Sequence, residues 1–328
     1  MILYIGTQSE QTASEGIYWA ELDERTGALQ VKGSVRNKNN PMYLCLDGTW
    51  LYSADHPENE GGVSVYRLEG AQPRYVRSVW VHQEKTCYVL AFKEYLLLAN
   101  YGSGSISLLS RKDDSVQFLE NKAFVGNGPH PDQPHSRIHC IRQNGLGSVF
   151  ATDLGGDRLY LLDVCSDRIR ILDHLQTSPG IGPRHMAADV DKQRVYVLGE
   201  LKNTIVVANY TRNTLEKVAE IPIYDVPVPS AGSEILLDRE CRHLYTANRG
   251  DNTISIFTLQ NGLPELVGRV PCGGVHPRHM AYVAGRYVLV SNMHSNQIAV
   301  FECVGDTLQQ RFDLPIPGPS CVIEGDGR

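Results

Sequence analysis

The sequence predicts an all-β protein, a seven-bladed β-propeller, and the main evidence is an internal repeat. A short hydrophobic strand that runs into a polar turn and out into a second strand recurs along the 328 residues. The turns lie about 44 to 53 residues apart, as expected for blades of roughly four strands. The units begin at Leu3, Leu51, Tyr95, Val149, Val195, Leu244 and Tyr287. Each blade buries its faces only against its neighbours, so we expect residues 1–328 to form a single domain.

The fifth unit shows how one blade is built. Turn-forming residues separate four extended runs, and we expect strands at residues 185–189, 194–198, 204–210 and 216–221. Runs such as VYVL are apolar on both faces, which favours sheets stacked against neighbouring blades. No segment shows a convincing helical period.

The two ends of the chain are expected to share one blade. The chain opens with what resembles the second strand of a blade, residues 1–6, and closes with a segment that resembles a first strand. Residues 320–323 are therefore predicted to supply the inner strand of this blade. Such a hydrogen-bonded closure removes both open edges of the ring.

Composition excludes several classes of protein. A hydrophobic content of 42% and a charged content of 21% are ordinary for a soluble globular chain. The net charge of −6 gives no basic surface for nucleic acid, and no apolar run is long enough to cross a membrane. The eight cysteines form no CxxC pair, and the N-terminus lacks the basic segment of a signal peptide. We therefore expect reduced thiols, a cytoplasmic location and neither nucleic-acid nor membrane partners.

Aligning the units places two sets of positions beside the central channel. The first set begins the inner strand of each blade: Met42, Cys87, His135, Arg184 with His185, Ser233 with Glu234, Arg278 with His279, and Ser320. The second set follows the turn after the second strand: His56, Tyr101, Leu154, Glu200, Arg249 and Met293. Glu200 and Arg249 hold matching places in consecutive blades, so their opposite charges favour a contact across the ring.

These side chains predict an anion-binding cleft with acid–base capacity, because arginines, histidines and carboxylates converge at one mouth of the channel. The structural alternative is that the repeated PRHM segment is a repeat consensus, in which Arg184 and Arg278 brace a turn. We expect no metal site and no cofactor. His139 alternates with inward residues of a strand, so it is not expected to converge with His130 and His135. Phosphate-loop, nucleophile-elbow and zinc-protease motifs are absent from the sequence.

Several motifs together resemble those of one known family. They are QPHS at 133–136, GPRHMA followed by GEL, TANRGDNTISIF, and the opening YIGT with GIYWAEL. Over essentially the whole chain they resemble the seven-bladed propeller lactonase family, which includes propeller-type 6-phosphogluconolactonases and is similar to carboxymuconate-lactonising enzymes. The resemblance implies a metal-independent cleft lined by His135, Arg184, Glu200 and Arg249. The chain departs from the family pattern at Gly199, where the family has Asn before the glutamate.

Three functions are consistent with these residues. The first is hydrolysis of an anionic sugar lactone, in particular 6-phosphoglucono-1,5-lactone. Glu200 or His135 would act as general base, and Arg184 or Arg249 would stabilise the oxyanion. Arg278 would hold the phosphate, and the remaining substrate-binding candidates are His185, His279 and Glu234. The second is lactonisation of a muconate-like dicarboxylate. The third is a non-enzymatic scaffold that binds a protein partner through an exposed apolar patch.

Overall fold

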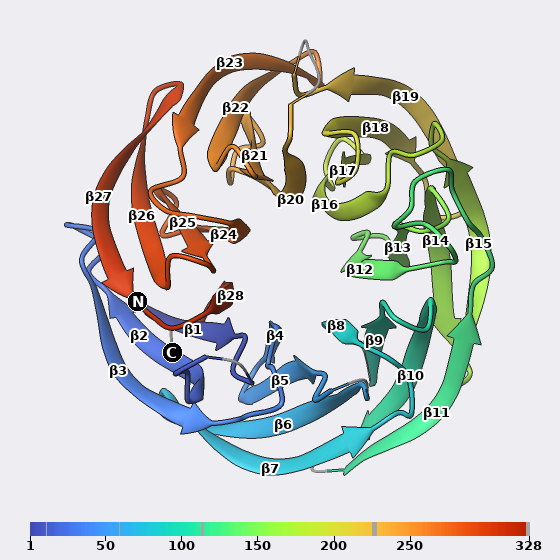
Figure 1. The fold of residues 1–328 in the computed structure, drawn as a ribbon. Helices are drawn as coiled ribbons and strands as arrows, with labels where there is room; N and C mark the ends of the chain where they lie inside the picture. Colours follow the sequence, from blue (N-terminus) through green and yellow to red (C-terminus); the bar gives the residue numbers. More distant parts are fainter. Residues whose placement is uncertain (11, 59, 113–114, 225–227, 326–328) are drawn as a thin grey trace.

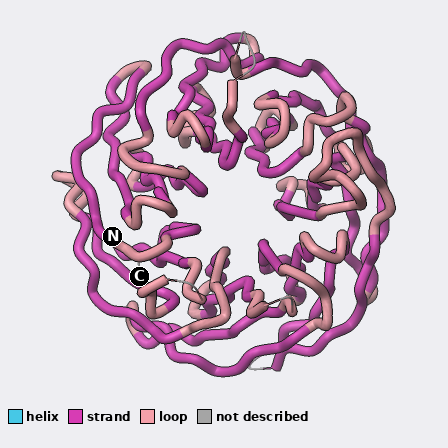
Figure 2. Tube along the Cα trace, viewed as in Figure 1, coloured by secondary structure: helices cyan, strands magenta, loops and turns pink. Residues whose placement is uncertain are grey.

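Seven four-stranded sheets stand in a ring around a central channel in the computed structural model, which describes residues 1–10, 12–58, 60–112, 115–224 and 228–325 (Figure 1). The described residues form strands, turns and loops without a helix (Figure 2). The predicted all-β class and seven-bladed propeller are therefore confirmed. No described segment is a helix long and apolar enough to span a membrane.

Each blade is an antiparallel meander that runs from the channel outward. The first sheet contains β28 (Pro319–Glu324), β1 (Ile2–Thr7), β2 (Gly16–Leu22) and β3 (Leu29–Arg36). The second contains β4 (Tyr43–Asp47), β5 (Trp50–Asp55), β6 (Gly62–Glu69) and β7 (Gln72–Trp80). The third contains β8 (Thr86–Phe92), β9 (Tyr95–Asn100), β10 (Ser105–Lys112) and β11 (Ser115–Ala123).

The remaining four blades follow the same order. The fourth contains β12 (Ile138–Gln143), β13 (Val149–Asp153), β14 (Arg158–Cys165) and β15 (Arg168–Gln176). The fifth contains β16 (Pro183–Asp189), β17 (Arg194–Gly199), β18 (Thr204–Tyr210) and β19 (Leu215–Pro222). The sixth contains β20 (Ala231–Leu237), β21 (His243–Arg249), β22 (Thr253–Gln260) and β23 (Leu263–Pro271). The seventh contains β24 (Pro277–Val283), β25 (Tyr287–Asn292), β26 (Gln297–Val304) and β27 (Thr307–Pro315).

The core lies between the faces of neighbouring blades. Every residue of β9 and of β25 is buried, whereas the outer strand β15 is mostly exposed. Side chains of Leu97, Leu161 and Val206, from three successive blades, belong to one continuous apolar cluster. This packing explains why the middle strands are apolar on both faces.

The chain closes the ring as predicted. The strand β28 pairs with β1 in an antiparallel register that sets Leu3 opposite Glu324 and Ile5 opposite Val322. The first and last strands of the chain consequently lie side by side in one blade (Figure 1). The Ser320 hydroxyl also donates to the carbonyl of Met42 in the next blade, at 3.0 Å.

A one-residue β-bulge near the start of the inner strand recurs around the channel. Six of the seven inner strands carry it within the described residues, and the extra residues are Cys87, His139, Arg184, Ser233, Arg278 and Ser320. A bulge sets two residues against one on the partner strand and re-aims their side chains. The bulges thus decide which side chains reach the two ends of the channel. We call the end where the inner strands begin the upper mouth, and the opposite end the lower mouth.

Candidate active site

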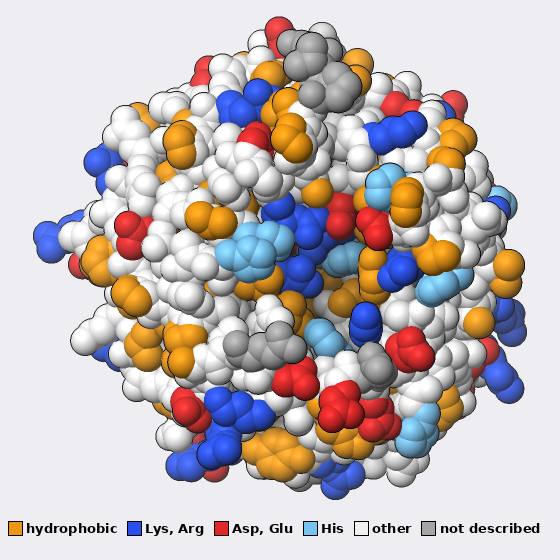
Figure 3. Space-filling model, viewed as in Figure 1, with side chains coloured by type: hydrophobic (Ala, Val, Ile, Leu, Met, Phe, Trp, Pro, Cys, Tyr) orange, Lys and Arg blue, Asp and Glu red, His pale blue; other side chains and the backbone are white. Residues whose placement is uncertain are grey.

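The upper mouth contains a cavity of about 250 Å³. Its lining residues are Met42, His56, Lys85, Cys87, Tyr101, His139, Arg184, Glu200, Arg249 and Arg278. The space-filling view of Figure 3 shows cationic, acidic and histidine side chains gathered around the hollowed centre of the molecule. Four predicted residues, Arg184, Glu200, Arg249 and Arg278, therefore meet in one place.

Glu200 joins two of these arginines. Its Oε2 lies 2.9 Å from Nε of Arg184, and its Oε1 lies 2.8 Å from Nη2 of Arg249. Arg184 is 1% exposed, and its Nη1 also donates to the carbonyl of Ser233 in the next blade. The ion pair predicted between Glu200 and Arg249 is present.

The carboxylate of Glu200 is held in its charged form. Burial alone raises the pKa of Glu200, but the neighbouring guanidinium groups of Arg249 and Arg184 outweigh burial and bring it below its usual value. The glycine before it has a steric cause: a Cβ on Gly199 would lie 2.4 Å from Cγ2 of Ile181. The departure from the family's Asn thus lets the chain pass close to the preceding loop, where Glu200 N donates to the carbonyl of Gly182 at 2.9 Å.

Arg278 faces the same cavity, and no described carboxylate forms an ion pair with it. No hydrogen bond or ion pair of its side chain is present among the residues that the structure describes. Burial, together with the positive charges of Arg184 and Arg249, lowers its pKa to about 9. At neutral pH Arg278 is still a cation, so an anion bound here would relieve the repulsion among the three guanidinium groups.

His139 lines the cavity, although the sequence pattern did not select it. It is 6% exposed, and its buried Nδ1 has no hydrogen-bond partner among the described residues. Its ring meets that of Tyr101 edge to face at 5.5 Å between centroids. Burial and then the charge of Arg184 hold the pKa of His139 well below its ordinary value, so the ring is a neutral base at pH 7.

His135 lies elsewhere. It is exposed, its Nδ1 lies 2.8 Å from the carbonyl of Ser136, and it does not line the cavity. The neighbouring motif residues have structural roles. The buried Gln133 donates to Asp157 at 2.8 Å, and Ser136 donates to Asp153 at 2.8 Å. The sequence alignment placed His135 at the start of the inner strand. In the structure this strand, β12, begins at Ile138, and its bulge residue is His139.

Three further predicted residues lie toward the lower mouth. His185, Glu234 and His279 line a second cavity of about 510 Å³, which shares no lining residue with the upper one. The sequence grouped them with the arginines because each stands at the start of the inner strand of its blade. In the structure these three side chains line the lower cavity, whereas the arginines line the upper one.

The described residues contain no group of three or more His, Cys, Asp and Glu side chains arranged to hold a metal ion. All eight cysteines are free thiols. The upper mouth therefore has a characteristic set of charges: three arginines and a lysine surround one carboxylate, beside the neutral imidazoles of His56 and His139.

Comparison with known proteins decides the family. The family model described as "Lactonase, 7-bladed beta-propeller" matches residues 2–324. The chain belongs to this lactonase family. This makes it an enzyme, a lactonase, and favours the enzymatic predictions over a non-enzymatic scaffold.

Individual relatives cover the whole chain at modest identity. A 6-phosphogluconolactonase of Bacillus subtilis strain 168 is 28% identical, and the match covers 97% of each chain. The crystal structure of a putative 6-phosphogluconolactonase from Bacteroides uniformis is 25% identical, with a TM-score of 0.91 over 98% of each chain. A periplasmic gluconolactonase of Pseudomonas aeruginosa is 24% identical, with a TM-score of 0.90 over 98% of each chain, which is a likeness of fold.

Proposed function

We propose that the upper mouth hydrolyses a phosphorylated sugar lactone, with 6-phosphoglucono-1,5-lactone as the substrate. The observation that carries the proposal is the guanidinium of Arg278, which has no ion-pair partner among the described residues and lies beside the Arg184–Glu200–Arg249 cluster. A phosphate dianion suits a site where cations outnumber carboxylates, and a guanidinium offers a fork of donors that matches phosphate. The name carried by the Bacillus subtilis relative supports this substrate.

The chemistry requires a base for water and donors for the developing oxyanion. We place the base on His139, since its neutral ring lines the cavity and its Nδ1 has no hydrogen-bond partner among the described residues. His139 would accept a proton as the water oxygen attacks the lactone carbonyl. It would then return that proton to the ring oxygen when the C–O bond breaks, and the new carboxylic acid would ionise to solvent.

Arg249 and Arg184 are the candidates to stabilise the oxyanion, and Glu200 holds both in position through its two ion pairs. Glu200 is a weaker candidate for the base than the sequence suggested, because both of its oxygens are paired and its pKa is lowered. The base role predicted for His135 rests on its motif alone, as this exposed side chain lies outside the cavity.

The phosphate is tested by comparing two lactones on the purified protein. We expect Arg278→Gln to raise KM for 6-phosphogluconolactone about 10- to 100-fold, the usual loss for a charge-assisted hydrogen bond of about 1.5–3 kcal/mol. The same variant should change KM for unphosphorylated glucono-1,5-lactone little. Rates are read after subtraction of spontaneous hydrolysis, and Arg170→Gln, on the exposed outer strand β15, is the matched control. An equal change in KM for both lactones would show that Arg278 does not bind the phosphate, and the proposed phosphorylated substrate would be rejected.

We also place the protein in the cytoplasm. The eight free cysteines support a reducing compartment, although one structural neighbour is a periplasmic protein. Fractionation of the source cells that recovers the protein outside the cytoplasm would reject this location.

A further inference from the structure

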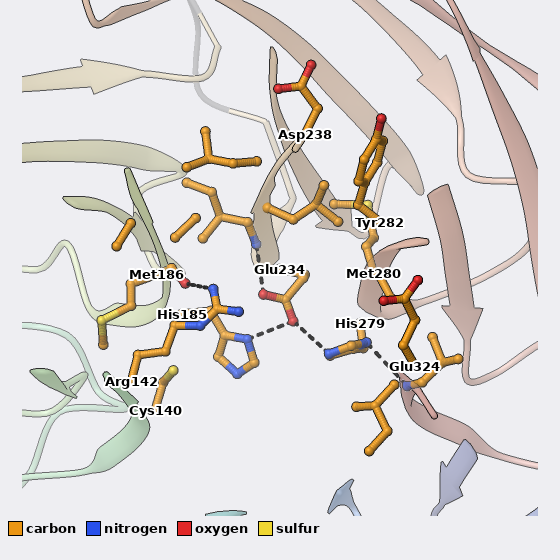
Figure 4. A pocket seen from close by; sticks show the side chains of 18 of the residues that line it. Cys140, Arg142, His185, Met186, Glu234, Asp238, His279, Met280, Tyr282 and Glu324 are labelled. Atoms are coloured by element: carbon orange, nitrogen blue, oxygen red, sulfur yellow. Dashed lines mark hydrogen bonds and ion pairs between the residues drawn. The ribbon is translucent and has the colours of Figure 1, made fainter. Parts of the chain in front are cut away.

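The lower mouth holds the larger of the two cavities, at about 510 Å³ (Figure 4). It is closed from above by Tyr43 and by five side chains that directly follow bulge residues. We call these six residues the middle ring: Tyr43, Tyr88, Cys140, His185, Glu234 and His279. The aromatic members pack together. Tyr43 stacks on Tyr88 with 3.8 Å between ring centroids, and its edge meets the ring of His279 at 5.6 Å. The middle ring thus separates the two cavities.

The rest of the wall combines apolar side chains with the cations Arg142 and Arg239 and the carboxylates Asp238 and Glu324. Ala187, Leu236, Ala281 and Ile323 line this part of the cavity together with Arg142. Nη1 of Arg142 donates to the carbonyl of Met186 at 2.7 Å, and no carboxylate forms an ion pair with it among the described residues. The side chain is exposed to the cavity, so its other N–H groups are free to bind an anion.

A chain of hydrogen bonds fixes the tautomer of His185. Val322 N donates to Nδ1 of His279 at 3.4 Å, so neutral His279 carries its proton on Nε2, which faces Glu234 at 3.4 Å. Nδ1 of His185 lies 2.8 Å from the same oxygen, Oε2 of Glu234, and donates its proton there. This leaves Nε2 of His185 as an unshared acceptor, on the side of the ring away from Glu234 (Figure 4).

Burial keeps this network in a fixed charge state. His185 is 5% exposed and Glu234 is 5% exposed. Burial, followed by the charge of Arg184, holds the pKa of His185 well below its ordinary value, and burial lowers the pKa of His279 to about 4. Both rings are neutral at pH 7, so the accepting nitrogen of His185 is available throughout the neutral range.

We propose that the lower cavity is a second ligand site, separate from the lactonase site, for a small hydroxycarboxylate with an apolar body. The carboxylate binds the free N–H groups of Arg142, and the hydroxyl donates to Nε2 of His185. The apolar body packs on Ala187, Leu236 and Ala281. A monoanion suits the site better than a phosphate dianion, because the lining carries three carboxylates, Glu234, Asp238 and Glu324, and only two cations.

Mandelate, its amide and phenylacetate test the proposal by calorimetric titration of the full chain. Mandelate has the carboxylate, the adjacent hydroxyl and an apolar ring, whereas mandelamide lacks the charge and phenylacetate lacks the hydroxyl. We expect mandelate to bind at millimolar or lower concentration. Mandelamide should bind about tenfold or more weakly, and phenylacetate about two- to tenfold more weakly.

Two variants locate the binding. Arg142→Gln should weaken mandelate binding about tenfold or more and make mandelate and mandelamide nearly equal, while Arg170→Gln, on the outer strand β15, leaves both unchanged. Arg278→Gln, at the upper mouth, should not alter mandelate binding. Absence of mandelate binding, or a loss caused by Arg278→Gln and not by Arg142→Gln, would overturn the second site. Because binding is measured without turnover, these results are independent of the outcome for lactone hydrolysis.

Discussion

The two mouths of the channel are built from the same inner strands, yet they carry opposite balances of charge. The upper cavity is lined by four cationic side chains and one carboxylate, whereas the lower cavity is lined by two cationic side chains and three carboxylates. Adjacent residues of one strand take part in different cavities: Arg184 faces the upper mouth and His185 the lower one. The difference shows that individual positions along the inner strands decide the chemistry of each cavity. The repeated blades hold these positions in place and do not themselves determine the function.

Removing the strand that closes the ring should have the largest effect on both cavities. A chain that ends at Pro315 lacks β28, leaves the ladder edge of β1 unpaired and opens the ring. We expect it to be insoluble or unfolded, as measured by soluble yield and circular dichroism. A chain that ends at Gly325 keeps the strand and serves as the control. A folded, active protein without β28 would show that closure is dispensable to both sites.

The next largest effect is expected from substitutions that distinguish the general base, His139, from Glu200, the residue that positions the arginines. His139→Gln should lower kcat for the lactone about 10²- to 10⁴-fold and leave the fold intact, because it removes only the proton acceptor. The matched control is His174→Gln, on the exposed outer strand β15.

Glu200→Gln should behave differently from His139→Gln. It leaves Arg184, which is 1% exposed, without its counter-charge, and loss of one partner from a buried pair costs about 3–5 kcal/mol. Urea unfolding should therefore detect Glu200→Gln and not His139→Gln. If His139→Gln keeps wild-type turnover while a stable Glu200→Gln loses it, the general base is Glu200 and not His139.

A smaller effect should appear in the pH dependence of stability. In the folded protein burial lowers the pKa of His279 to about 4 from 6.5, so the unfolded chain binds the extra proton first as the pH falls. His279 therefore costs stability as the pH drops from 6.5 toward 4, by at most roughly 3 kcal/mol. Glu234 acts in the opposite direction, since burial raises its pKa and protonation then favours the folded state.

The measurement is urea unfolding at pH 6.5 and pH 4.5. The wild type should lose stability between these values, and His279→Gln should lose less. An unchanged dependence of stability on pH in His279→Gln would mean that burial does not hold His279 neutral, which would weaken the contrast between the two mouths.

Strand positions in this chain follow from its sequence, because turn residues and apolar runs repeat in every blade. Residues 204–210 were predicted as a strand and form β18 (Thr204–Tyr210), and the neighbouring strands extend by at most two residues beyond their predicted bounds. The meeting of Glu200 with Arg249 was also predictable, since the two residues hold equivalent turns in adjacent blades and carry opposite charges.

The bulges limited the prediction of the site. In the fourth blade the inner strand was expected to begin at His135, whereas β12 begins at Ile138 and its bulge residue is His139. A bulge inserts one residue without a sequence signature. The same feature hid the division between the cavities. Arg184 and His185 are neighbours in sequence, and only the register around the bulge shows that they serve different ends of the channel. The role of Arg142 was equally hidden, because an arginine inside an inner strand looks like any solvent-facing strand residue.

The recurring bulge has a consequence for how this enzyme can be varied. The extra residue has no paired residue on the neighbouring strand, so its side chain can change without disturbing strand register. Cys87 and His139, which line the upper cavity, are therefore natural positions for a combinatorial library, in which new acids, bases or small cavities are presented at the upper mouth while the blades stay intact. Positions whose side chains can be exchanged in this way allow one propeller to be adapted to new substrates by point substitution, without remodelling a loop.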